Sequence, residues 1–242
     1  MATRVALQAV PDRPRRALAL LPARVRAMRR PKWWQEIAFI GVCYWLYSLV
    51  RNAVPSHQVA AGHRAFDLLA VERTLHIGVE KSINLFVAHN HWLAYICDYY
   101  YATLHFVITI AVLVWIYRKH PLRYRSIRSV LLATNLVALI GFWFYALRPP
   151  RMLAGQGYVD TVVTFHTWGS MASGGLAKAS NQFAAMPSLH IGWSLWCAVV
   201  IVALAERRWV RVLGALYPCA TLFVIIGTAN HYMLDAAGGV AV

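Results

Sequence analysis

Residues 91–117, HWLAYICDYYYATLHFVITIAVLVWIY, form an apolar run longer than the about 20 residues that cross a bilayer as a helix. Several similar runs occur along the 242-residue chain, which is 60% hydrophobic and 14% charged. Soluble domains carry roughly 25% charged residues, so half of the usual charge is missing. The sequence therefore predicts an all-α integral membrane protein.

Six segments are predicted to span the membrane as one bundle. They cover residues 34–50, 91–117, 129–147, 187–205, 212–229 and 231–242. The sixth is too short to cross by itself, because 12 residues of helix reach only about 18 Å and the hydrocarbon core is about 30 Å thick. We therefore expect the last helix to be truncated in this chain.

The net charge of +15 does not indicate nucleic-acid binding, because the basic residues lie in short clusters between the apolar runs. Nine Lys and Arg residues precede the first run, and the second and fourth connections are also basic. This alternation predicts a cytoplasmic N-terminus. Frequent Ala and Arg suggest a bacterial protein of the plasma membrane. The sequence does not indicate an oligomeric state.

The predicted organisation is a basic cytoplasmic arm over residues 1–32, helical over 15–29, followed by a transmembrane domain over residues 33–242. Apolar residues near helical spacing within residues 51–90 predict two short helices in the outer interface. Residues 148–186 contain five glycines and are expected to cap the extracytoplasmic end. The four cysteines are isolated within apolar runs, so we expect neither a disulfide nor a metal site from them.

Polar motifs stand where three of the apolar segments begin or end, all on the predicted extracytoplasmic side. His231 and Asp235 are four residues apart, so a helix places them on one face. A carboxylate that accepts the Nδ1–H of an imidazole leaves Nε2 free to act as a nucleophile. The alternative is a buried His–Asp hydrogen bond that only ties two helices together.

The second motif, Pro187-Ser188-Leu189-His190, opens the fourth span. A helix N-terminus offers free N–H groups to phosphate oxygens, Ser188 adds a hydroxyl, and His190 is placed to act as a general acid and base. The third motif, Arg148-Pro149-Pro150-Arg151, ends the third span with two guanidiniums suited to phosphate. Capping and lipid head-group contacts are the alternatives for each motif taken alone.

Taken together, these motifs resemble those of the type-2 phosphatidic acid phosphatase superfamily of lipid phosphatases and phosphotransferases, over roughly residues 34–242. The resemblance implies a six-helix membrane bundle that uses no metal or cofactor. It implies that His231 is the nucleophile, Asp235 its orienting acid and His190 the general acid and base. It also implies that Arg148 and Ser188 bind phosphate.

Two expected phosphate ligands are missing. The family's first motif has a lysine where this chain has Gly141, and its third motif has an arginine where this chain has Ile225. Candidates to replace them are Arg151, Lys178 and Asn230. The forms of the three motifs are most similar to those of the inositol-phosphorylceramide synthase-like branch, whose members transfer a polar phosphoryl head group between lipids.

Tyr100 and His105 lie in the second span and are further candidates to line the site, with hydrogen bonding between helices as the alternative. A metal site is disfavoured because the guanidiniums make the local field positive. We expect an enzyme that moves a phosphoryl or head-group phosphoryl unit from a membrane lipid to water or a hydroxyl through a phosphohistidine. A lipid-binding or transport protein without catalysis is the alternative.

Overall fold

The computed structural model describes residues 31–54, 58–168 and 181–242, and within them the chain is helical apart from turns and one isolated bridge between Leu147 and Ala184. The helix predicted over residues 15–29 and Lys178 lie outside the described residues. Of the predicted arm over residues 1–32, only residues 31 and 32 are described. The longer helices are α3 (Trp33–Ala53), α4 (Gln58–Thr74), α5 (Glu80–Ala88), α6 (His91–Tyr99), α7 (His105–Lys119), α8 (Pro121–Phe144), α11 (Leu189–Leu204), α12 (Arg208–Gly227) and α13 (Met233–Ala241).

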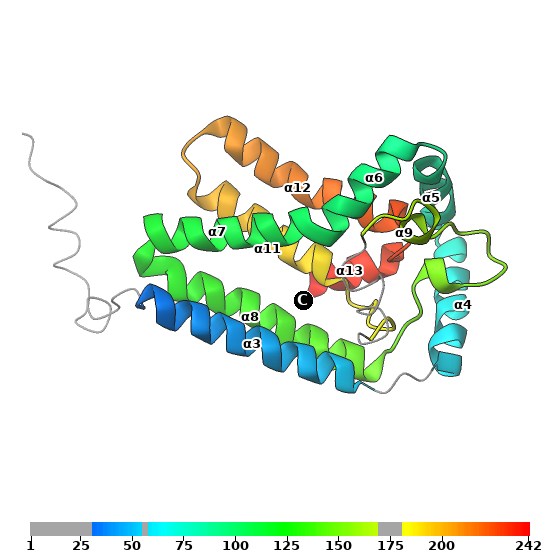
Figure 1. The fold of residues 1–242 in the computed structure, drawn as a ribbon, viewed down its shortest axis with the longest axis horizontal. Helices are drawn as coiled ribbons and strands as arrows, with labels where there is room; N and C mark the ends of the chain where they lie inside the picture. Colours follow the sequence, from blue (N-terminus) through cyan, green and yellow to red (C-terminus); the bar gives the residue numbers. More distant parts are fainter. Residues whose placement is uncertain (1–30, 55–57, 169–180) are drawn as a thin grey trace, which may run out of the picture.

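The long helices form a bundle in which consecutive members run in opposite directions (Figure 1). Helix α6 continues into α7 through a π-helical turn, Tyr100–Leu104, so that residues 91–119 act as one bent helix. Helix α3 packs along α8, and α11 packs against α7, α8 and α12. Figure 1 shows α4 lying across one end of this bundle, beside the short helix α9 (Thr161–Thr164) and the start of α13.

Among the described residues, three helices are long and apolar enough to cross a membrane: the combined helix 91–119, α8 and α12. Helices α3 and α4 together form a fourth candidate, bent by 94° at a short break. Helix α11 is apolar but has 16 residues, about 24 Å of rise. Helix α13 has nine residues, about 14 Å. Six spans therefore remain a prediction, whereas the all-helical architecture is confirmed.

The observed helix limits differ from the predicted spans where proline starts a helix. Helix α8 begins at Pro121 instead of residue 129, because the proline at its first position suits a helix start and the basic residues after it continue the helix into the connecting region. Within residues 51–90 the structure has α4 and α5, as predicted. Residues 148–186 contain α9 and a three-residue 3-10 turn, Pro150–Met152.

At the end of the bundle opposite α4, α3 and α8 are joined by an ion pair. The half-buried guanidinium of Arg128 contacts the carboxylate of Glu36, which is buried. The same guanidinium lies 4.5 Å from the ring centroid of Phe39. The apolar core in the middle of the bundle packs α7, α8, α11 and α12 together through side chains such as Ile116, Leu131 and Trp196.

Three carboxylates hold the start of α13. Glu72 of α4 accepts a hydrogen bond from the amide of Leu234 at 2.7 Å. Glu80 of α5 accepts one from the amide of Met233 at 3.0 Å, and Asp235 accepts one from the amide of Tyr232 at 3.1 Å. All three carboxylates are buried. Carboxyl groups of α4 and α5 therefore satisfy free amides at the start of α13.

Burial, reinforced by the neighbouring charges of Glu80 and Asp235, raises the pKa of Glu72 from 4.5 to about 8. The folded protein consequently keeps a proton that the unfolded chain loses, so the stability of the wild-type protein falls as pH rises from about 4.5 to about 8. In Glu72→Gln this part of the pH dependence is expected to vanish. Thermal unfolding in detergent between pH 5 and pH 8 measures it. Parallel pH profiles for the wild type and Glu72→Gln would contradict the assignment, and Glu206→Gln, an exposed carboxyl in the α11–α12 connection, is the control.

Candidate active site

The structure brings the three sequence motifs together through hydrogen bonds that involve their backbones. The amide of Arg151 donates to the carbonyl of Ala229 at 2.9 Å. The Tyr232 hydroxyl donates to the carbonyl of Arg148 at 2.8 Å, and the amide of Ser188 donates to the carbonyl of Asp235 at 3.0 Å. Each motif is thus fixed to the segment that carries His231.

Close packing of α11 on α13 depends on a glycine. A Cβ atom at Gly239 would overlap the carbonyl oxygen of Ser188, so only glycine allows the two helices to approach this closely. Ile191 of α11 lies against the same position. This contact places the first turn of α11, with His190, beside the residues that precede α13.

His231 and His190 face each other at the centre of the site. The Nδ1 atom of His231 lies 3.3 Å from a carboxylate oxygen of Asp235, and both residues are buried. The ring centroids of His231 and His190 are 5.6 Å apart in an edge-to-face arrangement. Because Asp235 occupies the Nδ1 side, Nε2 of His231 is the nitrogen left for chemistry. This is the arrangement that the His–x–x–x–Asp spacing predicts.

His190 also contacts rings from the second span. It stacks on Tyr101 with a centroid distance of 4.3 Å and lies 4.8 Å from the ring centroid of His105. His105 in turn lies 3.1 Å, through Nδ1, from the hydroxyl of Tyr217. The π-helical turn that joins α6 to α7 contains Tyr101 and therefore places this ring against His190.

Both histidines line a pocket at the end of the bundle near α4. Its polar side chains are Ser48, Arg51, His105, Arg151, Gln182, His190, Asn230 and His231. Its aromatic side chains are Tyr44, Tyr47, Tyr101, Phe106, Phe142 and Trp193. The pocket is thus amphipathic, because guanidinium groups, imidazoles and aromatic rings line it together.

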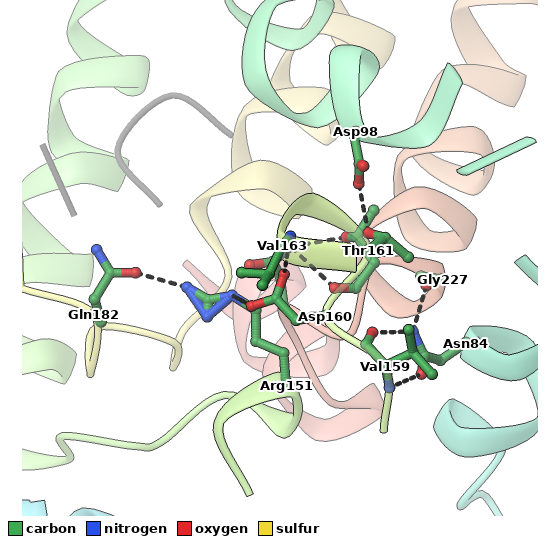
Figure 2. A network of polar contacts seen from close by, with 11 residues as sticks. Asn84, Asp98, Arg151, Val159, Asp160, Thr161, Val163, Gln182 and Gly227 are labelled. Carbon is green, nitrogen blue, oxygen red and sulfur yellow. Dashed lines mark hydrogen bonds and ion pairs between the residues drawn. The ribbon is translucent and has the colours of Figure 1, made fainter. Parts of the chain in front are cut away.

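Arg151 is oriented by two partners (Figure 2). Its Nη2 donates to the side-chain oxygen of Gln182 at 2.6 Å, and its Nε lies 3.9 Å from a carboxylate oxygen of Asp160. The Arg151 side chain is 8% exposed, so this interaction is shielded from bulk water. Asp160 also caps α9 by accepting from the amide of Val163 at 3.2 Å.

The segment that contains Asp160 is fixed to the outer helices. Figure 2 shows Asn84 of α5 joined to both sides of this region, since its amide nitrogen donates to the carbonyls of Val159 and Gly227 at 3.0 and 2.8 Å. Buried Asp98 of α6 accepts hydrogen bonds from the hydroxyls of Thr161 and Thr167. The described part of the expected cap is therefore hydrogen-bonded to α5 and α6, and Asn84 of α5 joins it to the end of α12.

The predicted site residues fall into two groups. His190, His231, Arg151, Asn230 and His105 line the pocket, with Asp235 directly behind His231. The others do not line it, and Lys178 lies outside the described residues. Arg148 donates to the carbonyl of Gln58 at 2.9 Å, and Tyr100 bonds to the hydroxyl of Thr221 at 2.8 Å. The buried hydroxyl of Ser188 has no hydrogen-bond partner among the described residues.

Sequence reasoning missed Arg51, Tyr101 and Gln182. Arg51 lies in the last turn of α3, far from the three motifs in sequence. In the sequence it is indistinguishable from other basic residues at the ends of predicted spans. Tyr101 follows two other tyrosines, and only the π-helical turn distinguishes its direction from theirs. In the described part of the chain, no group of three or more His, Cys, Asp or Glu side chains is arranged to hold a metal ion.

Comparison with known proteins agrees with this geometry. The family model of the PAP2 superfamily matches residues 66–242, which include all three motifs and most of the described bundle. No curated protein and no solved structure matches the chain. Because the match covers well over half of the sequence, the chain belongs to the PAP2 superfamily.

Proposed function

We propose that this protein is a membrane-embedded lipid phosphatase or phosphotransferase that works through a phosphohistidine at His231. Membership of the PAP2 superfamily supports a phosphatase-type activity. The observation that carries the proposal is the pair of imidazoles in the pocket, with Asp235 behind one of them and guanidinium groups beside them.

In the first step, Nε2 of His231 attacks phosphorus and the bond from phosphorus to the lipid oxygen breaks. Asp235 stabilises the positive charge that develops on the imidazole as the nitrogen–phosphorus bond forms. His190, acting as the general acid, gives its proton to the departing lipid oxygen. The products of this step are a lipid alcohol and a phosphohistidine.

In the second step, a water molecule or an acceptor hydroxyl enters the same pocket. His190, now neutral, takes a proton from the entering oxygen, which attacks phosphorus while the bond to His231 breaks. Water gives hydrolysis, whereas a hydroxyl gives transfer. A head-group transfer would agree with the similarity to the inositol-phosphorylceramide synthase-like branch.

The phosphate oxygens need positive charge and hydrogen-bond donors in this mechanism, because most of the catalysis of phosphoryl transfer comes from positioning and electrostatic stabilisation. Arg151 supplies a shielded guanidinium inside the pocket. Asn230 lines the pocket as well, and the first turn of α11 after Ser188 adds backbone amides. Arg148, which family resemblance assigns to phosphate, points toward α4.

The aromatic part of the pocket supports a lipid substrate. Tyr44 and Tyr47 of α3, Phe106 of α7 and Trp193 of α11 present apolar surface next to the polar part, as a lipid-linked phosphate requires. With the N-terminus in the cytoplasm, this end of a six-span bundle would face the extracytoplasmic leaflet of a bacterial plasma membrane.

Replacing His231 by Asn should remove turnover almost wholly, because the proposed covalent intermediate forms on the imidazole of His231. Phospholipids labelled at phosphorus, with rapid quenching, should give protein-bound label that is acid-labile and alkali-stable in the wild type and absent in His231→Asn. A variant with near-native turnover would refute the mechanism. If binding of the lipid persists while neither protein turns over any donor tested, the non-catalytic alternative would gain support.

Replacing His190 by Gln should slow reaction of a lipid phosphate by about 10²–10⁴-fold, the usual contribution of a general acid–base. An aryl phosphate with a nitrophenol leaving group does not need protonation in the first step. His190→Gln should therefore still release a burst of about one nitrophenol per enzyme and then stall as the phosphohistidine. Equal losses on both substrates, with no burst, would show that His190 is not the general acid.

Replacing Arg151 by Gln should reduce kcat/KM by about 10²-fold or more, because a shielded, charge-assisted contact to phosphate is lost. Arg148→Gln should reduce it by less than about tenfold, because Arg148 does not line the pocket. Steady-state kinetics in mixed micelles measures both. A larger loss of kcat/KM in Arg148→Gln than in Arg151→Gln would indicate that Arg148 binds the phosphate, as the family resemblance implies.

A further inference from the structure

The positions at which the family pattern expects two phosphate ligands are closed by packing in this protein. Gly141 of α8 lies against Pro187, and even a Cβ atom there would overlap the proline ring. A lysine at this position therefore does not fit beside the turn that starts α11. Ile225 of α12 is completely buried among Ile191, Ile226 and Ala236. An arginine there would place a charge within the apolar core.

A guanidinium from a different helix reaches the same pocket. Arg51, in the last turn of α3, lines the pocket together with Arg151, His190 and His231. Among the described residues, no carboxylate lies within ion-pair distance of Arg51.

Two consecutive residues orient the two pocket arginines. The Nη2 of Arg51 donates to the carbonyl of Asn181 at 2.9 Å, and the Nη2 of Arg151 donates to the side chain of Gln182 at 2.6 Å. The amide group of Asn181 also donates to the carbonyls of Arg51 and Val54 at 3.2 and 3.4 Å, which fixes the end of α3. Arg51 is thus held in place by its surroundings, with further N–H groups left for a ligand.

The charge of the pocket indicates an anion. Two guanidiniums and three imidazoles line the described pocket, and Asp160 is paired with Arg151 while Asp235 is paired with His231. A planar guanidinium presents parallel N–H groups that match two oxygens of one phosphate.

We infer that Arg51 is a phosphate-binding residue of this site and that it supplies, from α3, the positive charge that the family pattern places at the positions of Gly141 and Ile225. This inference rests on the proposed function. It also gives α3 a part in substrate binding, although α3 packs mainly on α8.

Binding of inorganic phosphate to the full chain in detergent tests the inference without turnover. Isothermal titration calorimetry with Arg51→Gln should show affinity at least about tenfold weaker than wild type, as expected for loss of charge-assisted hydrogen bonds. Arg51→Lys should lie between the two, because it keeps the charge and loses the planar fork.

Arg64→Gln is the matched control. Arg64 lies near the same end of the bundle and donates to the carbonyl of Ala146 at 3.2 Å, but it does not line the pocket. Affinity in this variant should stay within about twofold of wild type, because no contact to phosphate is lost. Arg51→Lys keeps the test valid if Arg51→Gln fails to fold.

The outcomes separate the inference from the proposed function. Unchanged phosphate affinity in both Arg51 variants, with weakened binding in Arg151→Gln, would overturn the inference and leave the phosphohistidine mechanism standing. No phosphate binding by the wild type, combined with undiminished turnover in His231→Asn, would overturn both. A KM increase in Arg51→Gln that parallels the loss of phosphate affinity would support the inference during turnover.

Discussion

The geometry of the site depends on how the short segment before α13 is held. Residues 229–235 form backbone or side-chain hydrogen bonds with the Arg148–Arg151 turn, with the start of α11 and with the carboxyl groups of Glu72 in α4 and Glu80 in α5. Ala229 adopts a positive φ of 51°, a conformation that costs a non-glycine residue about 1–2 kcal/mol. The surrounding contacts stabilise this turn, and the turn directs His231 into the pocket.

In the proposed mechanism, His231 needs little reorganisation during reaction because it is held in this way. The carboxylate of Asp235 contacts both the imidazole of His231 and the amide of Tyr232, so the same group orients the side chain and caps its helix. Buried carboxylates beside a helix start are favourable because the amides there are unsatisfied. The carboxylates of Glu72 and Glu80 therefore connect the outer helices, which lie far away in sequence, to the position of the reacting nitrogen.

The substitutions that distinguish this chain from the family pattern have a common physical cause. Gly141 allows the Pro187 turn to approach α8, and Ile225 completes an apolar cluster between α12, α11 and α13. Both residues allow close packing around the turn that starts α11 and carries His190. They also remove two cationic side chains, which leaves the requirement for positive charge to be met from other elements, and Arg51 and Arg151 are the guanidiniums in the pocket.

Much of the fold was predictable from the sequence alone, because apolar runs of helical length and the residues that interrupt them are local properties. The helical class, the positions of most helices and the two outer helices within residues 51–90 follow from that pattern. The pairing of His231 with Asp235 was predicted from four-residue spacing in one helix, and the contact is present, but His231 precedes α13 and Asp235 lies in its first turn.

Only the tertiary structure decided which arginines reach the pocket. Arg148 and Arg151 are three residues apart, yet the 3-10 turn Pro150–Met152 sends them to different neighbours. Arg51 enters the site through the packing of α3 on α8 and through Asn181, 130 residues later in the chain. Such contacts between distant segments leave no periodic signal in the sequence. The sequence by itself therefore determined the helices and the histidine–aspartate pair, while three-dimensional packing determined the cationic part of the site.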